Sequence, residues 1–353
     1  MTPLAAAFRA CCLALALTSA SLAQEDGWAG RLQQQVERID QAAPGRLGLY
    51  VKRLDTGETL SYQADRPWYL ASSAKLPIAI AVLQEVEAGR RRLGDTLRLQ
   101  ETDKVDGSGP LVWQGAGTGH TLQSLLRGML MASDNTAANM LVRSIGEERL
   151  NERAKAMLGR GFERLTTFTQ VRYDVYAELH PDARRLRNRQ LVEIAAAPLG
   201  PQRVEALRRA LGKDKSALQV PTLDEAYRRY YERGLNAATL QGYGGMLEQL
   251  VRGKLLSPAH TERLFTDLKI GSYDAYRLEA GLPRSVRFIH KTGTQFRRAC
   301  HMGVIEPQDG GRAAIVVAAC AEDLDEHKDA ARLFEQVGRA ITATMLPGRQ
   351  PRR

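Results

Sequence analysis

The chain has 353 residues, of which 44% are apolar, 25% charged and 6% aromatic. This ordinary globular composition excludes disordered, collagen-like and coiled-coil proteins, and the length suggests two domains or one domain built in two lobes. The net charge of +10 favours an anionic partner. Composition alone does not distinguish among nucleic acid, a membrane surface and a cell-wall polymer. The six His and four Cys residues form no HExxH or CxxC motif, so we expect neither a metal site nor another cofactor.

Residues 1–23 have the pattern of a secretory signal peptide. They carry one positive charge at Arg9, an apolar run over residues 10–17, and the small residues Ser21 and Ala23 before the expected cleavage point. The apolar run is much shorter than the roughly 20 residues that span a membrane, and no later run is long enough. We therefore expect no membrane span and a periplasmic or secreted protein.

Residues 24–70 and 285–346 are expected to form one lobe built on a sheet. Residues 47–54 and 58–63 form a predicted hairpin, and three further strands follow from Val286 onward. Two flanking helices are indicated by apolar residues at helical spacing, first Trp28, Leu32, Val36 and Ile39, and at the other end Leu333, Phe334, Val337 and Ile341. The two ends of the chain therefore predict a five-stranded antiparallel sheet covered by the terminal helices.

Residues 71–284 are expected to form an all-helical lobe. Its first helix, over residues 73–88, has apolar residues around nearly its whole circumference, which is typical of a buried helix. Further helices are predicted over residues 122–131 and 136–144. The fold class is thus mixed α/β, with a cleft between the two lobes as the usual place for a site. Residues 347–353 form a basic tail.

Cleavage of the signal peptide leaves Cys300 and Cys320 as the two cysteines of the exported chain. Both lie in predicted strands that residues 307–311 join as a hairpin turn. If the hairpin closes near Gly310, the two cysteines face each other at a distance that a disulfide tolerates. Export to an oxidising compartment favours the bridge, and two free cysteines buried on the sheet are the alternative.

Three short motifs occur in an order that points to nucleophilic serine chemistry. Ser72 and Lys75 lie one turn apart at the start of the buried helix, where a lysine of lowered pKa can take the proton of the hydroxyl. Ser133-Asp134-Asn135 follows between two helices, and Lys291-Thr292-Gly293-Thr294 lies on the first strand after the helical lobe. Taken singly, such motifs are also explained by helix caps and surface lysines.

With these motifs in this order, the chain resembles the class A β-lactamases and penicillin-binding proteins, which are penicillin-recognising serine hydrolases. The resemblance runs from about Trp28 to Met345 and is tightest at residues 71–77 and 131–139. The Ser-Asp-Asn sequence at residues 133–135 looks more like class A β-lactamases than like most D-alanyl-D-alanine peptidases. The resemblance implies a mixed α/β fold and an exported enzyme that acts through an acyl-enzyme.

The resemblance also implies roles for individual residues. Ser72 is the implied nucleophile, Lys75 helps to deprotonate it, and Ser133 relays a proton to the leaving nitrogen. Asn135 is implied to bind the acyl-amide side chain of the substrate. Asp134 is expected to be structural, with hydrogen bonds inside its own turn.

The strand motif supplies the remaining implied contacts. Lys291 and Thr292 hold the substrate carboxylate by charge and hydroxyl hydrogen bonding. Gly293 lets the strand backbone approach the ligand closely. The backbone N–H groups of Ser72 and Thr294 form the implied oxyanion hole.

The chain departs from the class A pattern around the expected deacylating base. The Glu-x-x-Leu-Asn pattern, whose carboxylate activates the deacylating water, is absent from residues 171–181. Glu178 is the nearest candidate there, and an exposed loop carboxylate is the alternative interpretation of that residue. No arginine is assigned to the substrate carboxylate, although Arg297 and Arg298 are near.

A basic helical insertion over residues 183–238 is a further departure. It carries twelve Lys and Arg residues against six Asp and Glu residues, a net charge of +6. Because nucleic acid is a poor partner outside the cytoplasm, the hypothesis is contact with an anionic wall polymer such as peptidoglycan or with a membrane face. A solvated helical surface is the alternative.

Three candidate functions are consistent with the motifs and with the differences from the class A pattern. Export, the Ser-Asp-Asn motif and the layout favour a hydrolase that opens β-lactam rings. The missing glutamate pattern favours a D-alanyl-D-alanine peptidase acting on peptidoglycan stem peptides, or a slowly deacylating penicillin-binding sensor. The expected partner is accordingly a small β-lactam or a D-Ala-D-Ala peptide.

Overall fold

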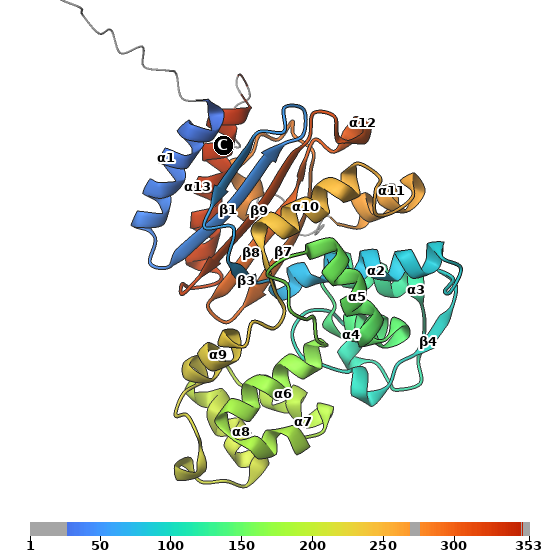
Figure 1. Ribbon diagram of the computed structural model, residues 1–353. Coiled ribbons are helices and arrows are strands. Elements are labelled where there is room, and N and C mark those ends of the chain that lie inside the picture. Colours follow the sequence, from blue (N-terminus) through green and yellow to red (C-terminus); the bar gives the residue numbers. More distant parts are fainter. Residues whose placement is uncertain (1–26, 269–275, 347, 349–353) are drawn as a thin grey trace, which may run out of the picture.

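The computed structural model describes residues 27–268, 276–346 and 348. The predicted signal peptide at residues 1–23 lies outside these ranges, as does the predicted basic tail apart from residue 348. Figure 1 shows a sheet with helices on both faces and further helices beside it. In the described part of the chain, no helix is both long and apolar enough to cross a membrane, and no group of three or more His, Cys, Asp or Glu side chains could hold a metal ion.

One five-stranded antiparallel sheet joins the two ends of the chain, as the sequence predicts. Its strand order is β2-β1-β9-β8-β7, and every neighbouring pair is antiparallel. The strands are β1 Arg46–Arg53, β2 Thr59–Tyr62, β7 Phe288–Gln295, β8 Arg298–Ile305 and β9 Ile315–Glu322. β7 therefore lies at one edge of the sheet, next to the turn that precedes the first buried helix.

The terminal helices α1 (Trp28–Ala42) and α13 (Lys328–Met345) cover one face of this sheet (Figure 1). Their apolar stripes meet alternate residues of the strands, because successive strand side chains point to opposite faces. Val36 and Phe334, for example, belong to the same buried cluster as Val317 of β9.

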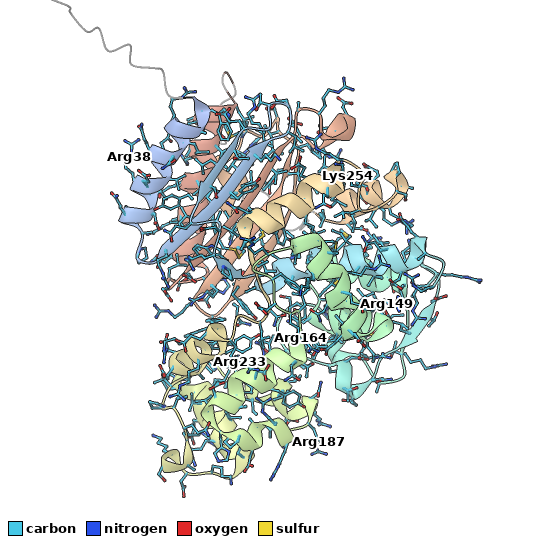
Figure 2. The ribbon with its side chains drawn as sticks, in the orientation of Figure 1. Arg38, Arg149, Arg164, Arg187, Arg233 and Lys254 are labelled. Carbon is cyan, nitrogen blue, oxygen red and sulfur yellow. A yellow bond between two sulfur atoms is a disulfide. The ribbon has the colours of Figure 1, made fainter. Side chains whose placement is uncertain are left out.

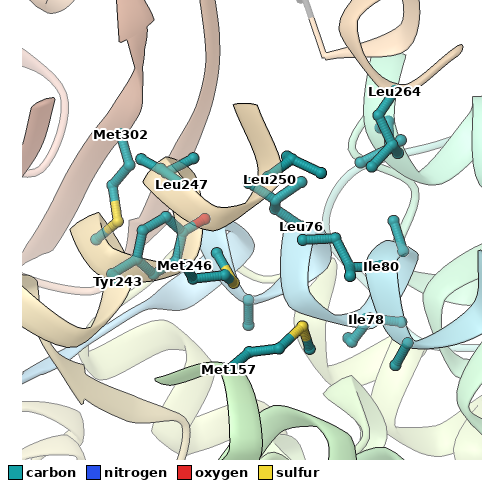
Figure 3. Close-up of a cluster of buried hydrophobic side chains, with 14 of the residues drawn as sticks. Leu76, Ile78, Ile80, Met157, Tyr243, Met246, Leu247, Leu250, Leu264 and Met302 are labelled. Atoms are coloured by element: carbon teal, nitrogen blue, oxygen red, sulfur yellow. The ribbon is translucent and has the colours of Figure 1, made fainter. Parts of the chain in front are cut away.

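Helix α10 (Leu240–Val251) covers the opposite face, and α2 (Lys75–Glu87) packs beside it. Figure 3 shows Leu76 of α2 and Leu247 of α10 in one apolar cluster with Met302 of β8. α2 is buried on nearly all sides, which confirms the prediction from its apolar circumference.

The helical lobe continues with further helices, of which the first two match the ranges predicted over residues 122–131 and 136–144 and the other two had no predicted range. Its further helices are α3 Leu122–Met131, α4 Asn135–Ile145, α5 Glu147–Leu158 and α11 Pro258–Asp267. The boundaries of α4 have a clear local cause, because Asp134 accepts a hydrogen bond from the backbone N–H of Ala137 at 2.8 Å. Asp134 is thus a helix cap, in keeping with the structural role expected for it.

Four helices form a separate packing unit with a core of its own (Figure 1, lower part). We call it the α6–α9 unit, and it consists of α6 Phe168–Leu179, α7 Asn188–Ala195, α8 Pro201–Leu211 and α9 Leu223–Glu232. Val175, Leu191 and Tyr230 are among its buried residues. The unit begins before the basic insertion expected from residue 183, because α6 packs directly against α9.

Several short elements were not predicted from the sequence. Two three-residue pairs lie outside the main sheet, β3 Pro67–Tyr69 with β6 Ala237–Thr239, and β4 Thr96–Arg98 with β5 Gly119–Thr121. The short element α12, Gln308–Gly311, is a turn rather than a regular helix, because Asp309 and Gly310 have positive φ, and it lies within the hairpin turn predicted over residues 307–311. The 3₁₀ turns are η1 Ala71–Ala74, η2 Glu101–Asp103, η3 Leu111–Trp113, η4 Pro181–Arg185, η5 Lys215–Ala217 and η6 Arg277–Gly281.

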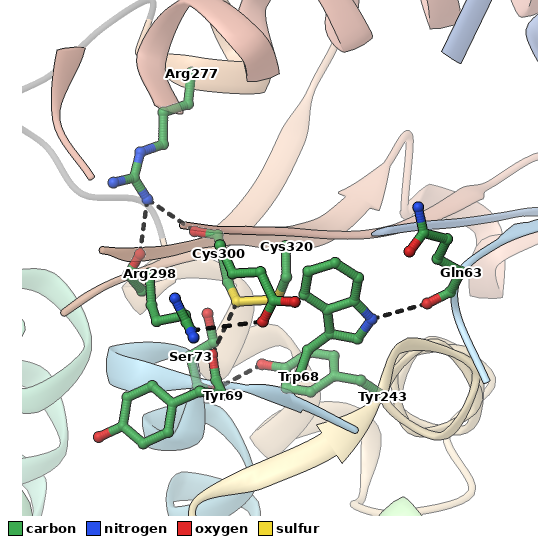
Figure 4. The surroundings of a disulfide bond; sticks show 11 residues. Gln63, Trp68, Tyr69, Ser73, Tyr243, Arg277, Arg298, Cys300 and Cys320 are labelled. Carbon is green, nitrogen blue, oxygen red and sulfur yellow. Dashed lines mark hydrogen bonds and ion pairs between the residues drawn. A yellow bond between two sulfur atoms is a disulfide. The ribbon is translucent and has the colours of Figure 1, made fainter. Parts of the chain in front are cut away.

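A disulfide joins Cys300 of β8 to Cys320 of β9. The two residues are direct partners in the register of the strands, and their Cα atoms are 4.1 Å apart. This confirms the register expected from a hairpin that closes near Gly310. Figure 4 shows the bridge on the sheet beside Trp68 and Tyr69, and the Tyr69 carbonyl lies 3.3 Å from the Cys300 sulfur.

Candidate active site

Ser72 and Lys75 meet at the start of α2. Ser72 lies in η1, and Lys75 is the first residue of α2, so the two are three positions apart in a tight turn that places both on the same side. Lys75 Nζ lies 3.0 Å from Ser72 Oγ. Lys75 is fully buried, whereas Ser72 is half-buried and lines a cavity. A half-buried hydroxyl thus lies next to an amine that is shielded from water.

Ser133 approaches the same lysine from the turn between α3 and α4. Its φ of 54° is in the left-handed region, which turns the chain so that both its carbonyl and its hydroxyl reach Lys75. Lys75 Nζ donates to the Ser133 carbonyl at 2.5 Å and lies 3.0 Å from Ser133 Oγ. It also donates to Asn135 Oδ1 at 2.6 Å.

The strand motif completes the cluster from β7. Lys291 Nζ lies 3.1 Å from Ser133 Oγ, so Ser133 stands between two lysines. Gly293 presses against η1, where a Cβ atom would lie 2.3 Å from the Leu70 carbonyl oxygen. Any side chain at this position would force β7 away from Ser72, which explains the requirement for glycine.

Burial lowers the pKa of both lysines. The pKa of Lys75 is held well below its ordinary value, mainly by burial and also by the nearby charge of Lys291, while Asp134 opposes the shift. The pKa of Lys291 is lowered to about 7, mainly by burial and also by the nearby guanidinium of Arg277. A lysine of lowered pKa has a lone pair that can accept the serine proton.

Two adjoining cavities meet at Ser72. The larger has a volume of about 540 Å³ and lies between the lobes, as predicted for the cleft, with a lining of Ser72, Ser108, Met131, Ala132, Ser133, Tyr276, His290, Thr292, Thr294 and His327. The smaller, which we call the rear pocket, has a volume of about 80 Å³ and is lined by Tyr69, Ala71, Ser72, Gly107, Ser108, Asn135, Phe168, Val171, Arg172, Thr294 and Gln295. A third cavity of about 850 Å³ lies in the α6–α9 unit and contains none of the motif residues.

Phe168 occupies the side of Lys75 that faces the α6–α9 unit. Its ring centroid lies 4.5 Å from Lys75 Nζ. Glu178 is ten residues further along α6, which at 1.5 Å per residue is about 15 Å along the helix axis, and it lines neither cavity at Ser72. The structure therefore does not bring Glu178 to the cluster, and no Asp or Glu side chain lines either cavity within the described residues.

Arg277 is a site residue that the sequence patterns missed. Its side chain is 1% exposed, and it donates to the Gly293 carbonyl at 2.8 Å and to Thr294 Oγ1 at 2.9 Å. Figure 4 shows its further hydrogen bond to the Cys300 carbonyl. Arg277 lies in η6, 14 residues before Lys291, and no motif in the sequence around it marks it as a residue of the site.

The two arginines considered from the sequence have other partners. Arg297 lies 3.3 Å from Asp224 of α9, and Arg298 lies 2.9 Å from Asp323. Neither lines the cavities at Ser72. The sequence assigned no arginine to the substrate carboxylate, and Arg277, rather than Arg297 or Arg298, lies beside the strand motif.

Comparisons with known proteins agree with this geometry. The family model of the beta-lactamase enzyme family matches residues 31–345. Beta-lactamase CTX-M-6 of Salmonella typhimurium is 24% identical over 307 residues, covering 86% of this chain and 85% of the relative. A beta-lactamase of Rhodobacter capsulatus is 33% identical over 134 residues, but that match spans 38% of this chain and less than half, 45%, of the relative.

Solved structures share the fold over almost the whole chain. The structure of PBP-A has a TM-score of 0.65 at 20% identity and covers 89% of this chain and 96% of its own. An ancestral class A beta-lactamase has a TM-score of 0.65 at 25% identity and covers 89% of this chain and 100% of its own. Since the family match extends over most of the sequence, the chain belongs to the beta-lactamase enzyme family, in agreement with the class A resemblance of its motifs.

Proposed function

We propose that the protein is an exported serine hydrolase that opens β-lactam rings through an acyl-enzyme on Ser72. One observation carries the proposal. Lys75 Nζ lies 3.0 Å from both Ser72 Oγ and Ser133 Oγ, and Lys291 Nζ lies 3.1 Å from Ser133 Oγ. This arrangement forms a continuous path for a proton from the nucleophile to a leaving nitrogen.

Acylation follows from the order of these groups. Neutral Lys75 takes the proton of Ser72 as Oγ attacks the lactam carbonyl, and the N–H groups of Ser72 and Thr294 stabilise the oxyanion. Ser133 then gives its proton to the leaving nitrogen and is reprotonated from Lys75. The cation of Lys291 beside Ser133 favours this donation by lowering the pKa of the hydroxyl.

Substrate binding divides between β7 and α4. Thr292 lines the large cavity, and the buried side chains of Lys291 and Arg277 lie behind its wall, against Ser133 Oγ and Thr294 Oγ1, so the carboxylate of a β-lactam would bind on that side. Asn135 uses its Oδ1 for Lys75 and one Nδ2 hydrogen for the Asp106 carbonyl at 2.8 Å. The remaining Nδ2 hydrogen is available for the acyl-amide carbonyl of the substrate.

Deacylation is the weak step of this proposal. A deacylating water needs a base, and the described residues that line the two cavities at Ser72 include no carboxylate. Phe168 lies next to Lys75 instead. This observation favours the second candidate, a penicillin-binding sensor or D-alanyl-D-alanine peptidase that releases a β-lactam slowly, and among the similar solved structures a variant of PBP-A is described as an acyl-enzyme complex with penicillin G.

Export and contact with the cell wall belong to the same proposal. The Cys300–Cys320 disulfide suits an oxidising compartment such as the periplasm. Figure 2 shows basic side chains on both parts of the molecule, with Arg187 and Arg233 on the α6–α9 unit. Many cations of this unit have local anionic partners, as Arg209 has in Glu205, so the surface supports only a weak attraction to peptidoglycan.

The experiment that separates the candidates combines turnover with mass. Purified protein is mixed with a chromogenic cephalosporin, and colour and intact mass are followed together. A burst of about one equivalent with a persistent mass increase supports an acyl-enzyme that deacylates slowly. Steady fast turnover supports a full β-lactamase, and the absence of both colour and adduct would overturn the proposal.

A further inference from the structure

A buried cation lies at the back of the candidate active site. Arg172 of α6 is 8% exposed, and its side chain lines the rear pocket together with Ser72 and Asn135. None of the three sequence motifs contains it. Its place in the site results from the packing of the α6–α9 unit behind Ser72.

The guanidinium of Arg172 is only partly occupied by its neighbours. Its Nε donates to Asp106 Oδ1 at 2.7 Å, and its Nη1 lies 3.4 Å from the Tyr227 hydroxyl. A guanidinium has five N–H donors, and no hydrogen bond of Nη2 is found among the described residues. Gly107 lies beside this end, since a Cβ atom there would be at ordinary contact distance from Nη2, 3.8 Å, and would clash with Asn135 Nδ2 at 2.4 Å.

The rear pocket suits a small anionic group. Its volume of about 80 Å³ accommodates a carboxylate or a few water molecules. Ala71, Phe168 and Val171 form apolar parts of its wall, and none of the described residues that line it is acidic. In such surroundings a hydrogen bond between a guanidinium and a carboxylate is stronger than in water.

Asn135 connects this pocket to the substrate. An acyl-amide carbonyl bound by the one free Nδ2 hydrogen of Asn135 would lie at the mouth of the rear pocket. The substituent next to that carbonyl would then face Arg172, which lines the same pocket. A neutral substituent leaves the free donors of Arg172 to water, whereas an acidic substituent engages them directly.

We propose that Arg172 is a specificity-determining residue that binds a carboxylate on the acyl side chain of the substrate. The inference rests on the proposed acylation of Ser72 and adds the class of acyl donor that the site prefers. Asp106 acts as the internal competitor, because its carboxylate occupies part of the same guanidinium.

The test compares two penicillins that differ in one group. Benzylpenicillin and its derivative with a carboxylate on the benzylic carbon are used separately, and the second-order rate of acylation is measured by intact mass. The wild type should favour the carboxylated penicillin by about 10-fold or more, as expected for a hydrogen bond between charged groups. Arg172→Gln should reduce this ratio to about one.

Two further variants separate recognition from stability. Asp106→Asn frees the guanidinium and should raise the ratio above that of the wild type, which a merely structural Asp106–Arg172 pair would not do. Arg184→Gln is the matched control, because Arg184 belongs to the same unit, pairs with Asp174 at 3.0 Å and is 52% exposed. It should leave both rates unchanged.

The outcomes for the two proposals differ. Equal acylation by the two penicillins in the wild type, or a preference that Arg172→Gln retains and Asp106→Asn does not raise, would overturn the role of Arg172 while leaving the proposed function intact. Failure of both penicillins to acylate the wild type would overturn the proposed function and, with it, this inference.

Discussion

Replacing Phe168 with glutamate should convert a long-lived acyl-enzyme into one that turns over. Phe168 is the first residue of α6, and its ring lies 4.5 Å from Lys75 Nζ, beside the ester that acylation would form on Ser72. A carboxylate there can take a proton from a water in the rear pocket, whose volume of about 80 Å³ has room for it. General base catalysis typically contributes about 10²–10⁴-fold, so the deacylation rate should rise by that factor.

The substitution also has costs that the structure allows us to estimate. Phe168 is half-buried against the helical lobe, so its loss should lower the free energy of unfolding by about 1–2 kcal/mol, less than for a fully buried phenylalanine. The new charge at the start of α6 is stabilised by the helix dipole by about 0.3–1 kcal/mol. Its proximity to Lys75 should raise the pKa of that lysine, so acylation should slow while deacylation accelerates.

The assay follows single-turnover loss of the adduct by intact mass, together with steady-state hydrolysis. Phe168→Gln is the matched control, because it removes the ring without supplying a base. A folded Phe168→Glu variant whose adduct decays no faster than that of Phe168→Gln would refute the position assigned to the deacylating water.

Further predictions concern the two lysines, the disulfide and the loop glutamate. Lys75→Ala should slow acylation with modest change in binding, whereas Lys291→Ala should also weaken binding of the substrate carboxylate; equal, small effects in stopped-flow acylation would remove both from the site. Because the pKa of Lys291 is about 7, its positive charge is lost as the pH rises through that value. The kcat/KM for acylation by the wild type should therefore fall above about pH 7, and this decrease should be absent from Lys291→Ala. Reduction of the Cys300–Cys320 bridge should lower the free energy of unfolding by about 3 kcal/mol, measured by denaturant titration with and without reductant, and an unchanged midpoint would contradict it. Glu178→Gln should leave the deacylation rate unchanged, and a large accumulation of adduct in this variant would restore Glu178 as the base.

Much of the fold could be predicted because its patterns are local. The two apolar runs and the hairpin turn near Gly310 predict the register that brings Cys300 opposite Cys320. The pairing of β3 with β6 could not be predicted, because three residues are too few to show a period and the two partners are about 170 positions apart.

The candidate site divides in the same way. Ser72 and Lys75 could be paired from sequence because one helical turn separates them. Arg277 and Arg172 could not be identified, since each reaches the site through a fold that brings distant segments together. Glu178 was considered from its position in the sequence, and the continuous helix α6 carries it away from Lys75.

The identity of the acylated residue is the central claim, and peptide mapping of the penicillin adduct tests it most directly. The wild type is incubated with benzylpenicillin, digested, and sequenced by tandem mass spectrometry, with Ser72→Ala treated in parallel. The adduct should lie on Ser72, which is half-buried and lines the cavity, and should be absent from the variant. An adduct on Ser73 or Ser133, or one that persists in Ser72→Ala, would contradict the account.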